Sequence, residues 1–441
     1  MKEELIHYVW KTKNFDFKGL VTTEGSNLTI EKFGHYNLNA GPDFLEGMVS
    51  FGKSKWYGHI EMHVFSSDWI KHKHETDEKY QNVILHVVYE EDEIIYRKDG
   101  SRIPCIELKG RIPQHIIEGY EKLHARTDEI ACSSELGNEE VDIFYFQLNR
   151  MYVERLEAKS YPIAIELESN NNNWNQALFV SIAKGMGLPV NSHAMESLAK
   201  TIPISLVSKH SDQKFQLEAI FFGQAGMLLG NWIDEYPQRL KDEYSFLKKK
   251  YQLLGMNGVE WKLSRMRPAS FPTLRIAFLA ALYNKHPDLH AKILNEEHLE
   301  NVMNLFDLKI NDYWENHFLW DKETSYSKKR LGFTAKANII VNSIVPYLFA
   351  YGQFMAEDKY VDRAMRFMSK LKPESNNIIK RWKSHNINVR NAMDSQALIH
   401  LYKEYCLKKR CTECAFGNKI LKSISMLIKE DMEDTYRSLL I

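Results

Sequence analysis

Three features are missing from this sequence of 441 residues: long apolar runs, an excess of charge of one sign, and a disulfide-rich cysteine pattern. No window approaches the roughly 18 to 20 apolar residues of a membrane span, so we expect no membrane partner. Lysine plus arginine and aspartate plus glutamate each number 58, which excludes a global electrostatic attraction to nucleic acid. Five cysteines, three of them bunched near the end, do not form the framework of a secreted disulfide protein.

The first residues also lack the features of an export signal. They read M-K-E-E-L-I-H-Y-V-W, with acids and a histidine where a signal peptide has basic residues followed by a clean apolar stretch. We therefore expect a cytoplasmic protein. With 44% hydrophobic and 26% charged residues, the composition is that of a globular protein, and the length predicts two or three domains.

The pattern of apolar residues changes once along the chain. Residues 2–12 have the spacing of an amphipathic helix, 28–33 alternate like a strand, and 83–89 form the nearly continuous apolar run of a buried central strand. From about residue 112 the spacing is helical, and the last predicted helix covers 411–438. We therefore predict an α+β protein, with a mixed α/β domain over 1–110 and an all-helical region over 111–441.

Residues 41–65 predict a β-hairpin with an acid at its mouth. Asp43 follows Gly-Pro and precedes an apolar strand, and a short turn leads into a second strand over 55–65. Side chains of a strand alternate between the two faces of a sheet, so His59, Glu61 and His63 project together. In a simple register Asp43 lies within reach of them.

This arrangement resembles the catalytic core of the PD-(D/E)XK, or restriction-endonuclease-like, nucleases. In that superfamily Pro-Asp begins one strand and Glu-x-Lys lies on the next; here Pro42-Asp43 and Glu61-Met62-His63 occupy those places. The resemblance implies a divalent cation and hydrolysis of a phosphodiester. It covers about the first quarter of the chain, and the chain departs from it at His63, which stands where the superfamily has lysine.

The residue types of this motif suit metal-assisted hydrolysis. Asp43 and Glu61 offer the carboxylate oxygens that Mg2+ or Mn2+ prefers, and such an ion lowers the pKa of a bound water. His63 would orient or deprotonate that water, since its ordinary pKa lies near neutrality. Alternatively His63 binds the ion directly, which would favour Mn2+ or Zn2+. The competing interpretation is a solvated sheet face with ordinary polar residues.

Further histidines and an acid follow closely. His59, His74 and Asp77 are candidates for substrate binding beside the two carboxylates, and His72 lies nearby. His86 interrupts the apolar run of the central strand, where a buried polar group needs a hydrogen-bonding partner.

The cysteines form a second candidate metal site. Cys406, Cys411 and Cys414 are spaced C-x4-C-x2-C, and thiolates suit Zn2+ or a [4Fe-4S] cluster. A fourth ligand is needed, for which Cys132 is the natural candidate and Cys105 the weaker one, because Cys105 lies within a predicted strand. Such a site would hold the start of the helical region to its end. Free thiols are the alternative.

Over nearly its whole length the chain resembles the uncharacterised bacterial family called domain of unknown function 2851. The residues that carry this resemblance are N-A-G-P-D-F (39–44), G-H-I-E-M-H (58–63), N-V-I-L-H-V-V (82–88), Q-L-E-A-I-F-F-G-Q-A-G (216–226), R-M-R-P-A-S-F-P (265–272) and the C-terminal cysteines. The family implies no established function. From the residues of the hairpin and their resemblance to the PD-(D/E)XK nucleases, we expect a metal-dependent nuclease acting on DNA or RNA. The alternatives are a non-catalytic module that binds nucleic acid or protein, and a hydrolase of a small phosphorylated molecule.

Overall fold

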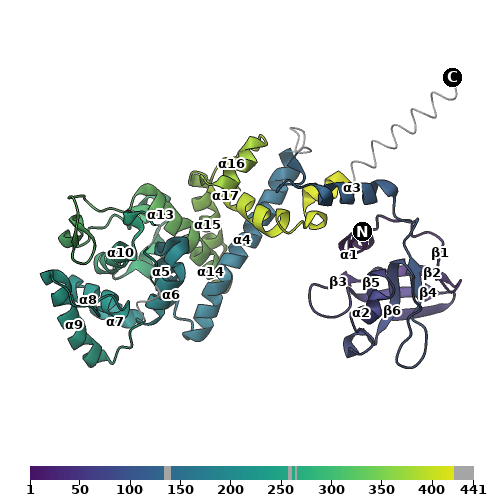
Figure 1. The fold of residues 1–441 in the computed structure, drawn as a ribbon, viewed down its shortest axis with the longest axis horizontal. Helices are drawn as coiled ribbons and strands as arrows, with labels where there is room; N and C mark the ends of the chain where they lie inside the picture. Colours follow the sequence, from purple (N-terminus) through teal and green to yellow (C-terminus); the bar gives the residue numbers. More distant parts are fainter. Residues whose placement is uncertain (134–140, 257–260, 264–265, 422–441) are drawn as a thin grey trace, which may run out of the picture. The chain divides into compact units, whose positions relative to one another are not determined.

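The computed structural model describes residues 1–133, 141–256, 261–263 and 266–421 (Figure 1). The chain divides into two compact units. The first, which we call the sheet unit, comprises Met1–Gln147 and Leu401–Ile441; the second, the helical unit, comprises Leu148–His400. The division expected at residue 110 marks the change from strands to helices. The two compact units divide the chain differently, because each of them contains helices. Most of the helix predicted over 411–438 lies outside the described residues.

The sheet unit contains one sheet in the order β1-β2-β4-β5-β6-β7, with β3 paired to β4. Its strands are β1 (Leu20–Val21), β2 (Asn27–Lys32), β3 (His35–Tyr36), β4 (Phe44–Phe51), β5 (Ser54–Phe65), β6 (Val83–Glu90) and β7 (Cys105–Glu107). Strands β4 and β5 pair as an antiparallel hairpin, while β5, β6 and β7 are parallel. Strand β6 is the central strand that its apolar run predicts, since residues 83–88 are all buried.

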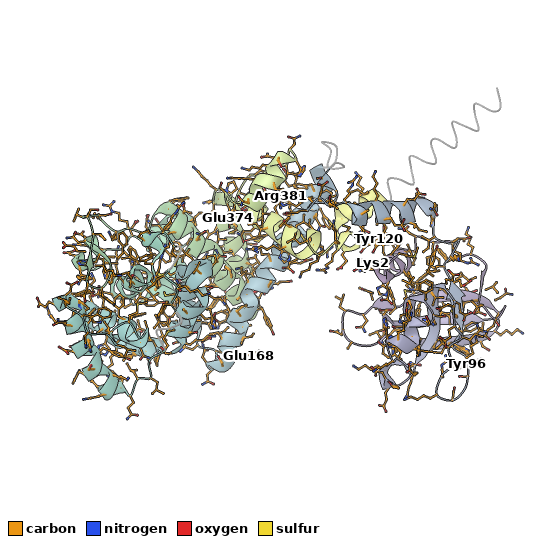
Figure 2. All side chains as sticks on the ribbon, in the orientation of Figure 1. Lys2, Tyr96, Tyr120, Glu168, Glu374 and Arg381 are labelled. Atoms are coloured by element: carbon orange, nitrogen blue, oxygen red, sulfur yellow. The ribbon has the colours of Figure 1, made fainter. Side chains whose placement is uncertain are left out.

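One helix from the N-terminus packs on this sheet. Helix α1 (Glu3–Thr12) buries Leu5, Ile6, Val9 and Trp10 against β5 and its neighbours, in the same core as residues of α3 (Gln114–Ala125). The Tyr120 hydroxyl of α3 donates to Glu4 Oε2 over 3.3 Å, so the two helices are also joined by a polar contact. Figure 2 shows the side chains on the ribbon and labels Tyr120.

Short helices complete the sheet unit. They are α2 (Asp68–Lys71), the 3-10 helix Glu78–Tyr80, the π-helix Leu401–Cys406 and the 3-10 helix Cys411–Glu413. Helix α4 (Val141–Ser169) begins in this unit and continues into the helical unit.

The helical unit confirms the predicted change from strands to helices. Its further helices are α5 (Trp174–Met186), α6 (Leu188–Lys200), α7 (Ile204–Lys209), α8 (Lys214–Gln224), α9 (Glu235–Tyr251), α10 (Pro272–Lys285), α11 (Leu289–Asn295), α12 (Leu299–Asn304), α13 (Phe333–Ile339), the π-helix Ile340–Ile344, α14 (Val345–Met355), α15 (Asp358–Lys370), α16 (Asn377–Ser384) and α17 (Ala392–His400), with short 3-10 helices at Pro268–Ser270 and Asp312–Glu315. Among the described residues, none of the helices has the length and apolar character needed to cross a membrane.

This unit is not entirely helical. Strands β8 (His317–Leu319) and β9 (Lys322–Glu323) form a two-stranded antiparallel sheet, whose turn includes Asp321 in the left-handed region with φ 54°. These strands are too short to show an alternating pattern in the sequence, so the expectation of an all-helical region missed them.

Candidate metal centre

Asp43 and Glu61 meet at the open end of the β4–β5 hairpin. The Asp43 backbone N–H donates to Glu61 Oε2 over 3.0 Å, and the Met62 backbone N–H donates to Asp43 Oδ2 over 3.0 Å. Each carboxyl group therefore binds the backbone of the other strand. This reciprocal pair holds the two side chains together without help from a ligand.

The chain segment before β4 determines where Asp43 lies. Gly41 has φ 124°, a conformation that favours glycine, and Pro42 follows it. The Asn37 side chain donates to Pro42 O over 2.9 Å, and the Asn37 backbone N–H donates to Asp43 O over 2.7 Å. The Gly-Pro turn is thus held by Asn37, the residue after β3, so Asp43 lies at the start of β4 opposite Glu61.

His63 lies two residues beyond Glu61 on β5 and is completely buried. Its Nδ1 is 2.8 Å from Nε2 of His86 on the neighbouring strand β6, so this nitrogen of the buried His86 has a partner, while His86 Nδ1 has none among the described residues. The other nitrogen, His63 Nε2, faces Glu61 Oε1 at 3.7 Å and His72 Nδ1 at 3.2 Å. Burial, reinforced by the neighbouring histidines, lowers the pKa of His63 to about 2, so its ring is neutral and offers a lone pair.

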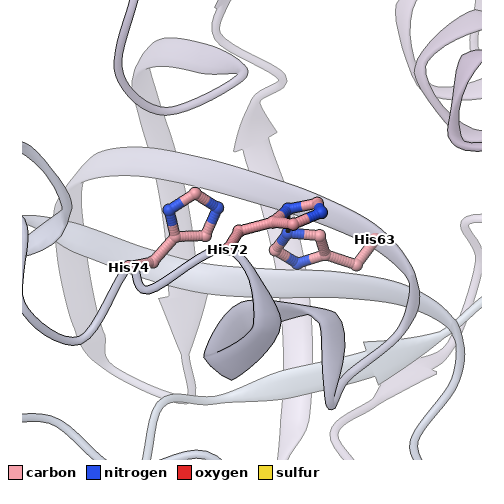
Figure 3. A group of neighbouring side chains, drawn as sticks. All are labelled: His63, His72 and His74. Atoms are coloured by element: carbon pink, nitrogen blue, oxygen red, sulfur yellow. Dashed lines mark hydrogen bonds between the residues drawn. The ribbon is translucent and has the colours of Figure 1, made fainter.

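Two histidines from the segment after β5 face the same group. His72 follows the last residue of α2, and His74 lies in the turn beyond it. His74 Nε2 is 3.2 Å from Glu61 Oε1, and its ring stacks on Tyr80 with 3.8 Å between centroids. Figure 3 shows the three rings of His63, His72 and His74 gathered beside one another. We call these three residues the histidine cluster.

Helix α1 adds two polar side chains that the sequence analysis did not include. Glu3 Oε1 is 3.9 Å from His63 Nε2, and His7 Nε2 is 3.1 Å from Asp43 Oδ2. They are four residues apart and so share one side of the helix. That spacing, beside the apolar stripe of an amphipathic helix, is the only signal in the sequence, and it does not say which strand the helix covers.

The carboxyl groups crowd one another in this buried place. Burial raises the pKa of Glu61 to about 9, and the nearby Asp43 carboxylate adds to the shift. Burial likewise raises the pKa of Glu3, with His7 opposing and Asp43 adding to the shift. Carboxyl groups that resist ionisation in the protein alone are stabilised as carboxylates by a cation, so the electrostatics fit a positively charged ligand.

Two further predicted site residues make contacts of other kinds. His59 is half-buried, and its Nδ1 accepts the Glu46 backbone N–H over 3.4 Å. Asp77 is exposed and accepts the Lys79 backbone N–H over 3.0 Å, which caps the 3-10 helix Glu78–Tyr80. Of the three residues predicted to bind substrate, the structure thus brings His74 against Glu61.

The cysteines come together at a second place in the sheet unit. Cys132, Cys406, Cys411 and Cys414 line one small cavity of about 20 Å3. Burial, and then the other three thiols, raise the pKa of Cys406. Cys105 lies apart from them, buried in β7. Gly417 packs tightly here, because a Cβ atom on it would lie 1.9 Å from Cys411 O.

Each of these three sets of donor atoms suits a different kind of metal ion. The histidine cluster and Glu61 offer imidazole nitrogens and a carboxylate oxygen, which fit zinc or manganese better than magnesium. The carboxyl pair Asp43 and Glu61 offers the oxygens that Mg2+ prefers. The four thiols suit zinc or an iron–sulfur cluster.

Comparison with known proteins assigns the chain to a family and to nothing more specific. Neither the curated proteins nor the solved structures contain a match. The family model described as "Protein of unknown function (DUF2851)" matches residues 3–377, which confirms the resemblance found in the sequence. The chain therefore belongs to this family, DUF2851.

Proposed function

We propose that the protein is a metal-dependent phosphodiesterase acting on DNA or RNA, with its active site at Asp43, Glu61 and His63. The observation that carries the proposal is the reciprocal bonding of Asp43 and Glu61 across the β4–β5 hairpin. Beside this pair, the neutral imidazole of His63 has its Nε2 3.7 Å from Glu61 Oε1 and 3.2 Å from Nδ1 of the exposed His72. That is the set of groups which metal-assisted hydrolysis needs.

Each residue has a distinct role in this proposal. Asp43 and Glu61 would hold a divalent cation such as Mg2+ or Mn2+, which when bound polarises the phosphate and activates water. His63 would orient that water or bind the ion itself, because its Nε2 faces Glu61 while its Nδ1 is engaged by His86. His74 is placed beside Glu61 to donate to a phosphate oxygen.

The alternative is a binding module that uses the same fold without catalysis. Its support is that backbone N–H groups already occupy one oxygen of each carboxyl group, Glu61 Oε2 and Asp43 Oδ2. In addition, His63 stands where the nuclease superfamily has lysine. A partner of this module would be nucleic acid or another protein. A hydrolase of small phosphorylated molecules remains a third proposal for the same residues.

A cleavage assay distinguishes catalysis from binding. The full chain is incubated with single-stranded DNA, double-stranded DNA and RNA in the presence of Mg2+, Mn2+ or a chelator, and wild type is compared with Glu61→Ala. We expect metal-dependent cleavage that falls by roughly 1000-fold or more in the variant. The control is Glu93→Ala, which removes an exposed carboxyl group of the same unit.

The outcomes separate the proposals. Equal cleavage by wild type and Glu61→Ala contradicts an active site at this hairpin. An absence of cleavage with every metal, together with binding of the same nucleic acids, favours the binding module. Thermal unfolding of each variant shows whether a lost activity reflects a lost fold, and Glu61→Gln, which keeps the shape of the side chain, provides a second test.

We also propose that Cys132, Cys406, Cys411 and Cys414 bind a structural metal. Support comes from their shared cavity and from the mutual effect of their thiols, since burial and Cys414 raise the pKa of Cys411 to about 11. A metal ion reverses this effect because it binds thiolates. The four thiols match the ligand shell of a structural Zn2+ site, and they equally match that of a [4Fe-4S] cluster.

A further inference from the structure

The histidine cluster has the dimensions of a metal site. One ligand nitrogen from each of His63, His72 and His74 lies within 4.8 Å of the other two (Figure 3). His63 Nε2 and His72 Nδ1 are 3.2 Å apart. Two ligands at about 2.05 Å from a tetrahedral zinc ion are separated by about 3.3 Å, so this spacing is close to that of a bound set.

Glu61 lies beside two of the three histidines. Its Oε1 lies 3.2 Å from His74 Nε2 and 3.7 Å from His63 Nε2. Its other oxygen, Oε2, accepts the Asp43 backbone N–H, so the carboxyl group is held with Oε1 directed to the imidazoles. Three nitrogens thus gather from β5 and the segment that follows α2, and a carboxylate oxygen lies beside two of them, those of His63 and His74.

The backbone around the cluster has an unusual conformation. Lys73, between the two histidines of this segment, has φ 61°, which a residue with a Cβ atom rarely adopts. The turn is closed by hydrogen bonds from Lys73 N to Ile70 O over 2.9 Å and from His74 N to Trp69 O over 3.1 Å. Here the turn directs both histidines to His63.

The buried neighbour of His63 suits a metal ligand. Metal-binding histidines usually donate their second ring N–H to a fixed acceptor, which sets the tautomer and the direction of the ring. His86 Nε2, 2.8 Å from His63 Nδ1, is in place to accept that hydrogen bond, and it leaves the lone pair on His63 Nε2 directed to the cluster. His86 is therefore a positioning residue for the cluster.

From this geometry we propose that His63, His72, His74 and Glu61 bind one transition-metal ion, with Zn2+ as the best fit, in preference to Mg2+. Imidazole is a good ligand for zinc and a poor one for magnesium, which takes oxygen donors. The inference deepens the proposed function, on which it rests for the reaction, because it identifies the cation and adds His72 to the site. His72 is exposed, so the cluster reaches the protein surface at this residue.

Zinc binding to the full chain tests the inference. The protein is stripped with a chelator and titrated with Zn2+ against a chromophoric zinc chelator, with total zinc measured by mass spectrometry. We expect His72→Ala and His74→Ala each to weaken one zinc site by about 100-fold or more, since even loss of an outer partner costs 10- to 100-fold. His35→Ala, which removes an exposed imidazole of the same unit, should bind as wild type does. The cysteine site contributes equally to all four proteins.

Two results would overturn the inference. One is unchanged zinc stoichiometry and affinity in both His72→Ala and His74→Ala; the other is displacement of this zinc by Mg2+ at a comparable concentration. Cleavage assays separate this inference from the proposed function. If zinc binds through His72 but no nucleic acid is cleaved, the zinc site stands and the proposed nuclease activity is contradicted. If cleavage depends on Mg2+ and on Glu61 but is unaffected by His72→Ala, the proposed nuclease activity stands and the zinc site is contradicted.

Discussion

The histidine cluster with Glu61 and the four-cysteine cavity are both groups of metal-ligand side chains in the sheet unit, yet they differ in access. His72 is exposed, so the first group opens to solvent. None of the four cysteines is exposed: Cys414 is buried, and Cys132, Cys406 and Cys411 are half-buried. Structural zinc sites are closed shells of four protein ligands, whereas catalytic sites keep a position open. The comparison therefore suggests chemistry at the histidines and a structural role for the cysteines.

The two groups also differ in the length of chain that they join. The histidine cluster and Glu61 lie within residues 61–74, while the cysteine cavity brings residue 132 to residues 406–414. Joining distant residues restricts the unfolded chain more than joining near ones, because the entropy of loop closure grows with loop length. A metal at the cysteines should therefore contribute more to stability than a metal at the histidines.

The largest effect is expected on protein stability, at the four-cysteine site. Cys411→Ser removes one thiolate, and a structural zinc contributes its binding free energy to folding, so we expect a loss of several kcal/mol and a fall in melting temperature of about 10 °C or more. Thermal unfolding with and without added Zn2+ measures it. Cys105→Ser, a buried cysteine away from the cavity, is the control. If both variants melt alike and retain the same zinc, the cysteine site is contradicted.

An intermediate effect is expected on zinc binding at the histidine cluster. His86→Leu removes the acceptor for His63 Nδ1, and we expect about 10- to 100-fold weaker zinc binding there. His86→Gln can place an oxygen where Nε2 lies, so it should retain most of the affinity. The chelator competition described above measures both variants. Equal weakening by the two substitutions would show that His86 acts through packing and not as a hydrogen-bond acceptor.

A third effect, comparable in free energy, should again separate the two groups. A methyl group on Gly417 would lie 1.9 Å from Cys411 O, so Gly417→Ala must displace the cysteine segment at a cost of about 1 to 3 kcal/mol. Stability and zinc binding at the cysteines should both fall, while binding at the histidine cluster stays unchanged. Denaturant unfolding and zinc stoichiometry check this. Loss of zinc at both sites would indicate that the two groups are coupled.

Local patterns predicted a large part of the candidate site. Alternation along β5 predicts that Glu61 and His63 share a face, and the Gly-Pro turn places Asp43 at the start of the neighbouring strand, where the structure has it. The apolar run of β6 predicts a buried strand and marks His86 as in need of a partner. These predictions succeed because strand geometry depends on neighbours in the chain and the hairpin turn is short.

Other parts of the site depend on packing between distant segments. The sequence near His72 and His74 does not reveal the left-handed conformation of Lys73 that directs them to His63. Nor does α1 reveal that Glu3 and His7 lie over the hairpin, since an amphipathic stripe shows which face of a helix is buried but not against what.

By itself, the sequence determined the family, the change from strands to helices and the hairpin with its acids, because each is recorded in residues close together along the chain. The sequence favoured Cys132 over Cys105 as the partner of the C-terminal cysteines, and the structure brings Cys132 to them; only the tertiary structure decided that residues 401–421 belong to the sheet unit. Only it made His72 and Glu3 neighbours of His63. Such contacts arise when separate segments bury their apolar faces together, and their partners are not encoded in any local pattern.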